Sequence, residues 1–142
     1  MPYQLKPRIL CIDDELSVAD LLRSFFERTG DFLIEVETNA IRAIHHARLF
    51  RPDVILMDIK MPGRDGLDLV REIREAPWLR HRPIIFLSGL PNVEELALKV
   101  GFGGPTEFLP KGVPLSVIEE TVRRLTAERL DLFKTSSSQI EQ

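Results

Sequence analysis

The sequence has little cysteine and no long apolar run. Cys11 is the only cysteine, so the chain has no internal disulfide framework and fits a reducing compartment, from which we expect a cytoplasmic protein. No apolar stretch approaches the roughly 18 residues that span a membrane, and residues 1–8 lack the apolar segment of a signal peptide. These absences predict a soluble protein with no membrane partner.

The chain also lacks an excess of basic residues. Its 19 lysines and arginines are outnumbered by 22 aspartates and glutamates, and the formal net charge is −3. A domain built to bind nucleic acid normally carries a clear positive patch, so we expect no direct nucleic-acid binding. The length of 142 residues is enough to bury a full core and most simply forms one domain with a tail.

Strand-like apolar runs alternate with amphipathic helical patterns five times along the chain. The expected strands are Arg8–Ile12, Leu33–Glu37, Val54–Met57, Ile84–Leu87 and Glu107–Leu109. Helical patterns follow at Val18–Phe25, at Ala40–Ala47 after the candidate N-cap Asn39, and at Leu69–Ile73, Leu96–Val100 and Leu115–Leu125. Strict alternation with short connections predicts right-handed crossovers and a parallel sheet.

Polar residues with complementary chemistry stand where the expected strands end: Asp13, Asp14, Asp58, Ser88 and Lys111. Ligands of parallel sheets bind beyond the carboxyl ends of the strands, so we expect these five side chains to converge. A carboxylate that ends a buried strand is costly unless a ligand or metal uses it. Three such carboxylates suit a magnesium ion, and one of them can also serve as a nucleophile.

The order and spacing of these residues resemble the receiver domain of two-component response regulators over about residues 8–126. The resemblance rests on Asp13-Asp14, Asp58 with the following Met61-Pro62-Gly63-Arg64-Asp65-Gly66, Ser88-Gly89, Phe108 and Lys111. It implies an α/β, flavodoxin-like (CheY-like) fold with a five-stranded parallel sheet in the order 2-1-3-4-5 and helices on both faces. Residues 1–7 would then be an N-terminal extension, and residues 127–142 an extended last helix with a polar tail or linker.

The family resemblance further implies that Asp58 is phosphorylated by a histidine kinase or a histidine phosphotransfer protein. Asp14 would bind Mg²⁺ directly, Asp13 more loosely, and Asp58 and the carbonyl of Lys60 would complete the metal ligands. Mn²⁺ could replace Mg²⁺. The chain would not be an enzyme in the usual sense, because it would catalyse only its own phosphorylation and dephosphorylation.

Three further residues receive roles from the same resemblance. Lys111 and Ser88 would contact oxygens of the phosphoryl group and so act beside Asp58 in catalysis. Ser88 would then move inward and the ring of Phe108 would fill the space, although Phe108 can also be read as simple core packing. The surface of the fourth helix, fifth strand and fifth helix would repack to control an unknown output partner or domain, and it could also pair two copies of the chain.

One stretch departs from the family pattern. Most receivers have a proline directly after the conserved lysine, in a cis peptide, whereas here Pro110 precedes Lys111 and Gly112 follows it. A cis bond without proline costs about 2.5–4 kcal/mol, so either the site stabilises it or the loop is trans. Pro110 lacks an N–H donor, which predicts that the last strand lies at an edge of the sheet.

Two other functions compete with the phosphorylation switch. A magnesium-dependent phosphohydrolase with an aspartyl nucleophile typically carries a second acid two residues after it, but that position is Lys60. A phosphorylation-independent interaction module with a receiver fold usually loses an acidic residue or the lysine, and this chain retains all of them.

Overall fold

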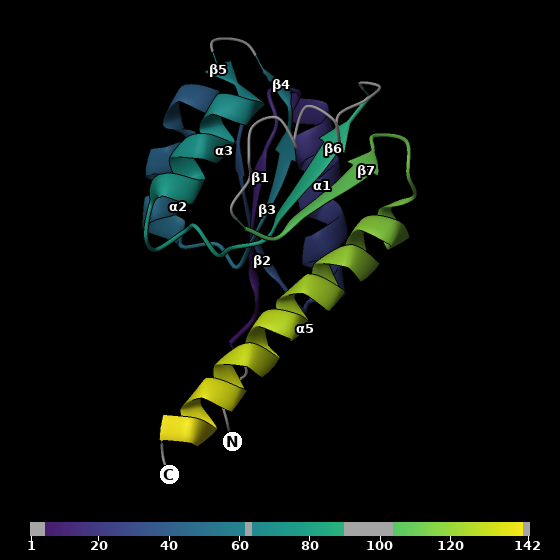
Figure 1. Cartoon of the computed structure of the whole chain (residues 1–142). Helices are drawn as coiled ribbons and strands as arrows, with labels where there is room; N and C mark the ends of the chain where they lie inside the picture. Colours follow the sequence, from purple (N-terminus) through teal and green to yellow (C-terminus); the bar gives the residue numbers. More distant parts are fainter. Residues whose placement is uncertain (1–4, 62–63, 90–103, 141–142) are drawn as a thin grey trace.

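The computed structural model describes residues 5–61, 64–89 and 104–140, and a five-stranded parallel sheet forms its centre (Figure 1). The strands are β1 (Arg8–Ile12), β2 (Leu33–Glu37), β3 (Val54–Asp58), β6 (Ile84–Ser88) and β7 (Thr106–Pro110). They lie in the order β2-β1-β3-β6-β7, and all neighbouring pairs are parallel. The expected order 2-1-3-4-5 is confirmed.

Helices cover both faces of the sheet (Figure 1). The first layer consists of α1 (Leu16–Thr29) and α5 (Leu115–Ile140), and the second of α2 (Ala43–Phe50) and α3 (Gly66–Glu75). Because side chains alternate along a strand, Ile9 and Cys11 of β1 pack toward the first layer, and Leu10 and Ile12 pack toward the second. Burial on both faces is the reason the central strands read as continuous apolar runs.

The helix ends follow local sequence signals. α1 stops at Gly30, which has the left-handed φ of 73° that glycine adopts without strain. Asn39 is an N-cap as expected, since its side chain accepts a hydrogen bond of 3.0 Å from the N–H of Ile41. The helix that it caps is a short 3₁₀ turn, η1 (Ala40–Arg42), which leads directly into α2.

Some elements differ from the sequence expectation. A two-residue antiparallel pair, β4 (Lys60–Met61) and β5 (Arg64–Asp65), lies between β3 and α3 and is too short to leave a periodic signal. β3 and β6 each extend one residue further than expected and include Asp58 and Ser88 themselves. The fourth helix expected at Leu96–Val100 lies outside the described residues.

The stretch Pro110-Lys111-Gly112 left two questions open: whether the last strand lies at an edge of the sheet, and whether the Lys111–Gly112 bond is cis. β7 pairs only with β6 in the described sheet, so the expected edge position is confirmed. No peptide bond of the described residues is cis, so Lys111 and Gly112 are joined by a trans bond.

α5 continues to Ile140, and Figure 1 shows it projecting well past the sheet. Among the helices described, none combines the length and apolar character needed to cross a bilayer.

Candidate functional site

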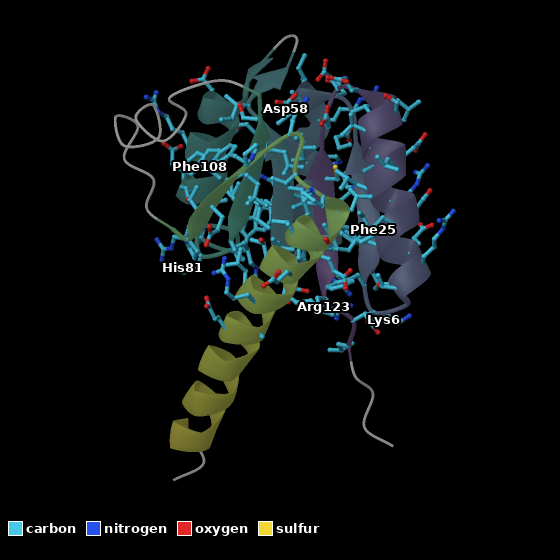
Figure 2. All side chains as sticks on the ribbon, turned by 90° about the vertical axis from the view of Figure 1, so that its right-hand side faces the viewer. Lys6, Phe25, Asp58, His81, Phe108 and Arg123 are labelled. Atoms are coloured by element: carbon cyan, nitrogen blue, oxygen red, sulfur yellow. The ribbon has the colours of Figure 1, made fainter. Side chains whose placement is uncertain are left out.

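Three carboxylates meet at the carboxyl edge of the sheet. Asp58 ends β3, and Asp13 and Asp14 directly follow β1, the strand beside it. The register pairs Ile12 with Met57, so the chain brings Asp13 level with Asp58. One carboxylate oxygen of each aspartate lies within 4.8 Å of the others; Asp13 and Asp58 are buried, and Asp14 is exposed. Figure 2 shows Asp58 at this end of the molecule.

Lys111 brings a positive charge to the same edge from the turn after β7. Its Nζ donates a hydrogen bond of 3.0 Å to Oδ2 of Asp58 and lies 3.9 Å from Oδ2 of Asp13. The turn is held in place because the N–H of Lys111 donates to the carbonyl of Ser88 at 3.3 Å. The expected convergence of aspartates and lysine is therefore present in the structure.

The charged groups at this edge shift one another's pKa values. The pKa of Asp13 is raised, chiefly by burial. The nearby carboxylates of Asp58 and Asp14 raise it further. The hydrogen bond from the Glu15 N–H and the charge of Lys111 lower it, but do not outweigh burial. For Lys111, burial lowers the pKa, but the hydrogen bond to Asp58 and the charges of Asp13 and Asp58 outweigh it and raise the pKa overall. Lys111 therefore stays protonated beside carboxylates whose negative charge is costly to bury.

Glu15 is a member of this edge that the sequence analysis missed. Its Oε1 accepts a hydrogen bond of 3.2 Å from Nζ of Lys111, and its N–H donates to Oδ1 of Asp13 at 2.9 Å. The available signal was the acidic run Asp13-Asp14-Glu15, in which a third acid directly precedes α1. Its side chain is 57% exposed, against 8% for Asp58, so water screens its ion pair with Lys111 more strongly.

The other predicted site residues lie around this cluster. Ser88 ends β6, one residue beyond Leu87, which pairs with Asp58. Lys60 begins β4 two residues after Asp58, and its side chain lies outside what the structure describes. Phe108 lies further down β7, where its ring stacks on Phe86 with centroids 5.3 Å apart and an interplanar angle of 16°. It is partly buried against the core on the α2–α3 face.

The donor set fits a hard divalent cation. Carboxylate oxygens are the preferred ligands of Mg²⁺, which commonly binds through one or two carboxylates and retains waters. Here the exposed Asp14 leaves one side of the cluster open to solvent, while Asp13 and Asp58 supply buried oxygens. Burial is the main cause of the raised pKa of Asp13, and a cation among these carboxylates would relieve the repulsion from Asp58 and Asp14 that adds to it.

Comparisons with known proteins identify the family of the chain. The family model for the response regulator receiver domain matches residues 9–123. The transcriptional regulatory protein BtsR of Escherichia coli is 33% identical over 124 residues, which are 86% of this chain and 49% of that protein. The chain spans about half the length of the first curated relatives that it matches.

Solved structures show the same fold. The signal receiver domain of a signal transduction histidine kinase from Syntrophus aciditrophicus is 30% identical, with a TM-score of 0.74 over 86% of this chain and 91% of that one. The BeF3-activated N-terminal receiver domain of RstA from Klebsiella pneumoniae is 26% identical, with a TM-score of 0.70 over 84% of this chain and 97% of that one.

Proposed function

Since this chain belongs to the response regulator receiver domain family, we propose that it is a signalling switch that is phosphorylated on Asp58. The observation that carries the proposal is the position of Asp58. Its carboxylate is buried beside two other aspartates and contacts Nζ of Lys111 at 3.0 Å. A receiver-fold module that did not use phosphate would have no need to keep this costly cluster of charges.

The proposed reaction transfers one phosphoryl group from a phosphohistidine to Asp58. A carboxylate oxygen of Asp58 forms a bond to phosphorus, while the bond from phosphorus to the donor's imidazole nitrogen breaks and its electron pair stays on that nitrogen. Lys111 stabilises negative charge on a phosphoryl oxygen, and the hydroxyl of Ser88 donates to another. The chain would catalyse this transfer and the later hydrolysis, and no other reaction.

The cofactor of the reaction would be Mg²⁺, with Mn²⁺ as a substitute. Asp14, Asp13 and Asp58 would hold it with their carboxylates, and Lys60 would add its backbone carbonyl. When bound, the ion supplies positive charge that offsets the charge of the phosphoryl oxygens. The residues of the chain orient the acceptor: β3 holds Asp58 in a buried position, and Lys111 fixes one of its two oxygens.

We infer that Ser88 and Phe108 convert phosphorylation into a change of surface. Ser88 and Phe108 stand on adjacent strands, and Phe108 is only three residues before Lys111. An inward movement of Ser88 would open space beside the ring, which is stacked on Phe86 and only partly buried. The face formed by the segment before β7, β7 and α5 would then repack and present a new surface to an output partner or domain, or to a second copy of the chain.

The partners follow from the reaction and from the length of the chain. The phosphoryl donor would be a histidine kinase or a histidine phosphotransfer protein. BtsR, which is about twice as long as the matched region, is named a transcriptional regulator, so an output domain in the same polypeptide is one form of partner. The single, buried Cys11 agrees with work in a reducing cytoplasm.

Beryllium fluoride with Mg²⁺ tests the switch, since the RstA receiver is described as BeF3-activated. We expect the backbone amide NMR signals of Ser88 and Phe108 to shift in the wild type and not in Asp58→Asn. Shifts confined to the residues around Asp58, with Phe108 unchanged, would show that this ring has no switching role. An unchanged spectrum in the wild type would favour the phosphorylation-independent interaction module.

A further inference from the structure

The outer face of η1 and α2 combines exposed apolar side chains with positive charge. Ile41 is 65% exposed and Leu49 is 72% exposed, and in the described chain only Leu5, near the N-terminus, is a more exposed large apolar residue. Ile41 lies in the 3₁₀ turn η1 and Leu49 lies eight positions later in α2, a separation of about 12 Å, or about two turns, if both were on one α-helix, and His45 lies exposed between them. They therefore form one stripe, opposite the buried residues Ala43 and Ala47.

Arginines flank this stripe without any acidic neighbour in the sequence. Residues 38–52 contain three arginines and two histidines but no aspartate or glutamate, in a chain whose net charge is −3. Arg42, Arg48 and Arg51 are all exposed. On the neighbouring strand β2, Glu35 and Glu37 contact the two ring nitrogens of His46 on α2 at 2.6 and 3.1 Å, and among the described contacts neither pairs with Arg42, Arg48 or Arg51.

Trp78 extends the same surface beyond α2. Its ring, in the segment after α3, is 36% exposed and lies under the guanidinium of Arg48, with 5.9 Å from Cζ to the ring centroid. This contact places Arg48 along the aromatic face, and Arg48 is itself exposed. We define the surface of Ile41, Arg42, His45, Arg48, Leu49 and Trp78 as the α2 surface. Figure 1 shows α2 at the outside of its layer, away from β7 and α5.

We propose that the α2 surface docks an acidic amphipathic helix of a partner protein. Two apolar anchors two turns apart match the spacing of side chains on one face of a helix that lies along α2. Arg42 and Arg48, on the two sides of the stripe, would pair with carboxylates on the rim of that helix, which also excludes basic partners. Only three large apolar side chains are offered, so the contact is small and transient. This surface is separate from Asp58 and does not depend on its phosphorylation.

Trp78 provides the measurement, because it is the only tryptophan of the chain. The probe is a synthetic helical peptide with leucines on one face and glutamates on the other, added to the unphosphorylated full chain while tryptophan emission is followed. We expect saturable binding that weakens at least tenfold in the double variant Ile41→Ser, Leu49→Ser. Arg42→Gln should weaken binding and reduce its dependence on salt. The matched control is Leu21→Ser on α1, where a leucine 56% exposed is removed from the other layer.

Three results with the peptides would overturn the proposal: equal binding of a peptide with lysines in place of the glutamates, equal weakening by Leu21→Ser, or no binding of the acidic peptide. A different occupant would also overturn it. This would be seen as binding to anionic phospholipid vesicles without binding to the peptide, or as self-association that the double variant abolishes in sedimentation. Circular dichroism of the double variant checks its fold, and Arg42→Gln gives an independent reading in which no apolar group is lost.

Discussion

Nζ of Lys111 lies 3.0 Å from Oδ2 of Asp58, although the two residues are 53 positions apart in the chain. β3 delivers the carboxylate and the turn after β7 delivers the ammonium, so the pair forms only when β6 lies between β3 and β7 in the sheet. The ammonium also contacts Glu15 at 3.2 Å. Nζ of Lys111 also lies 3.9 Å from Oδ2 of Asp13, so this one cation links three acidic side chains at the carboxyl edge of the sheet.

Replacing Lys111 tests its part in phosphoryl transfer. Lys111→Met removes the charge that would stabilise the phosphoryl oxygens, and we expect the rate of phosphorylation by acetyl phosphate to fall roughly a hundredfold. The same substitution at Lys6, which is exposed and distant from Asp58, should leave the rate unchanged. A Lys111→Met rate within a few fold of the wild type would remove Lys111 from the reaction.

The acid cluster predicts a specific pattern of stabilisation by Mg²⁺. Mg²⁺ at about a hundred times its Kd should raise the free energy of unfolding of the wild type by about 2.7 kcal/mol. Asp14→Asn should abolish most of this gain, measured as the shift in Tm between Mg²⁺ and chelator. Glu15→Gln should retain it, because the Glu15 carboxylate faces Lys111 and is not in the group of three aspartates. A larger loss of the Mg²⁺-dependent Tm shift in Glu15→Gln than in Asp14→Asn would show that the ion binds at a different site.

The thiol of Cys11 predicts a loss of stability at alkaline pH. Burial, and next the charge of Asp13, raise its pKa from 9.0 to about 12. Above pH 9.0 the unfolded chain loses this proton and the folded chain keeps it, so the free energy of unfolding falls with rising pH, by up to about 1.4 kcal/mol per unit. Cys11→Ala should lack this slope in urea unfolding between about pH 8 and pH 10. Identical slopes would show that the thiol ionises equally in both states.

The raised pKa of Lys111 acts in the same direction but at higher pH. Its unfolded value is 10.5, so its contribution to stability is complete below that pH and is lost above it. The comparison of wild type with Cys11→Ala is therefore made below pH 10.5, where only the thiol separates the two proteins.

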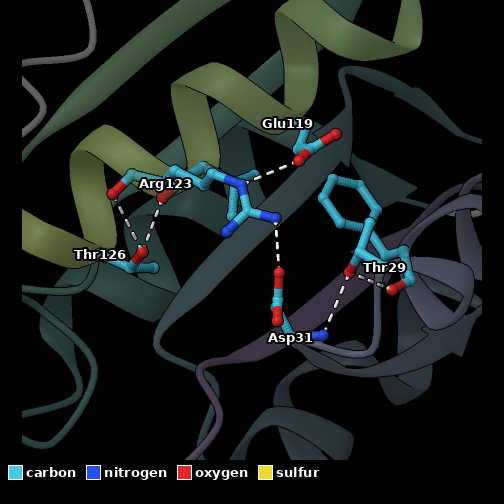
Figure 3. Close-up of polar contacts among 7 residues, drawn as sticks. Thr29, Asp31, Glu119, Arg123 and Thr126 are labelled. Carbon is cyan, nitrogen blue, oxygen red and sulfur yellow. Dashed lines mark hydrogen bonds and ion pairs between the residues drawn. The ribbon is translucent and has the colours of Figure 1, made fainter.

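Arg123 and Arg124 are neighbours on α5, and we expect their replacement by alanine to lower the free energy of unfolding by different amounts. The guanidinium of Arg123 donates to Asp31 at 2.8 Å and to Glu119 at 2.8 Å (Figure 3). It also lies 4.9 Å from the ring centroid of Phe32. These contacts join α5 to the turn before β2. We expect Arg123→Ala to lower the free energy of unfolding by about 1 kcal/mol, from an exposed ion pair and a cation–π contact.

The matched control is the next residue. Arg124 pairs with Glu107 at 2.8 Å and is as exposed, but none of the described contacts places it over a ring. Arg124→Ala should therefore cost less than Arg123→Ala in urea unfolding. Equal costs would show that the ring of Phe32 adds nothing to the attachment of α5.

The sequence predicted the sheet and the proximity of the aspartates and Lys111 for identifiable reasons. Buried parallel strands leave continuous apolar runs, and strand order came with the family resemblance. Asp13 directly follows such a run, Asp58 ends one, and Lys111 stands two residues after the last expected strand, so the three could be placed at the same edge. The pairing of Glu15 with Lys111 could not be predicted, since an exposed acid before a helix has the same pattern whether or not it has a distant partner.

The contacts of Arg74 are another feature that the sequence could not predict. Its guanidinium donates to the carbonyls of Arg80, Arg82 and Pro105 at 2.6–2.8 Å, and burial lowers its pKa to about 10. It holds the chain before β6 against the chain before β7, yet an arginine in the last turn of a helix normally reads as a solvated residue. Backbone carbonyls have no sequence signature, so contacts of this kind emerge only from the fold.

Intact-mass spectrometry after incubation with acetyl phosphate and Mg²⁺ tests the central claim most directly. Asp58→Asn removes the proposed acceptor, and Asp53→Asn makes the same change just before the other end of β3, where Asp53 accepts a hydrogen bond from the N–H of Arg8. We predict one phosphoryl group, labile to hydroxylamine as an acyl phosphate must be, on the wild type and Asp53→Asn and none on Asp58→Asn. An adduct of the same size and lability on Asp58→Asn would contradict the account.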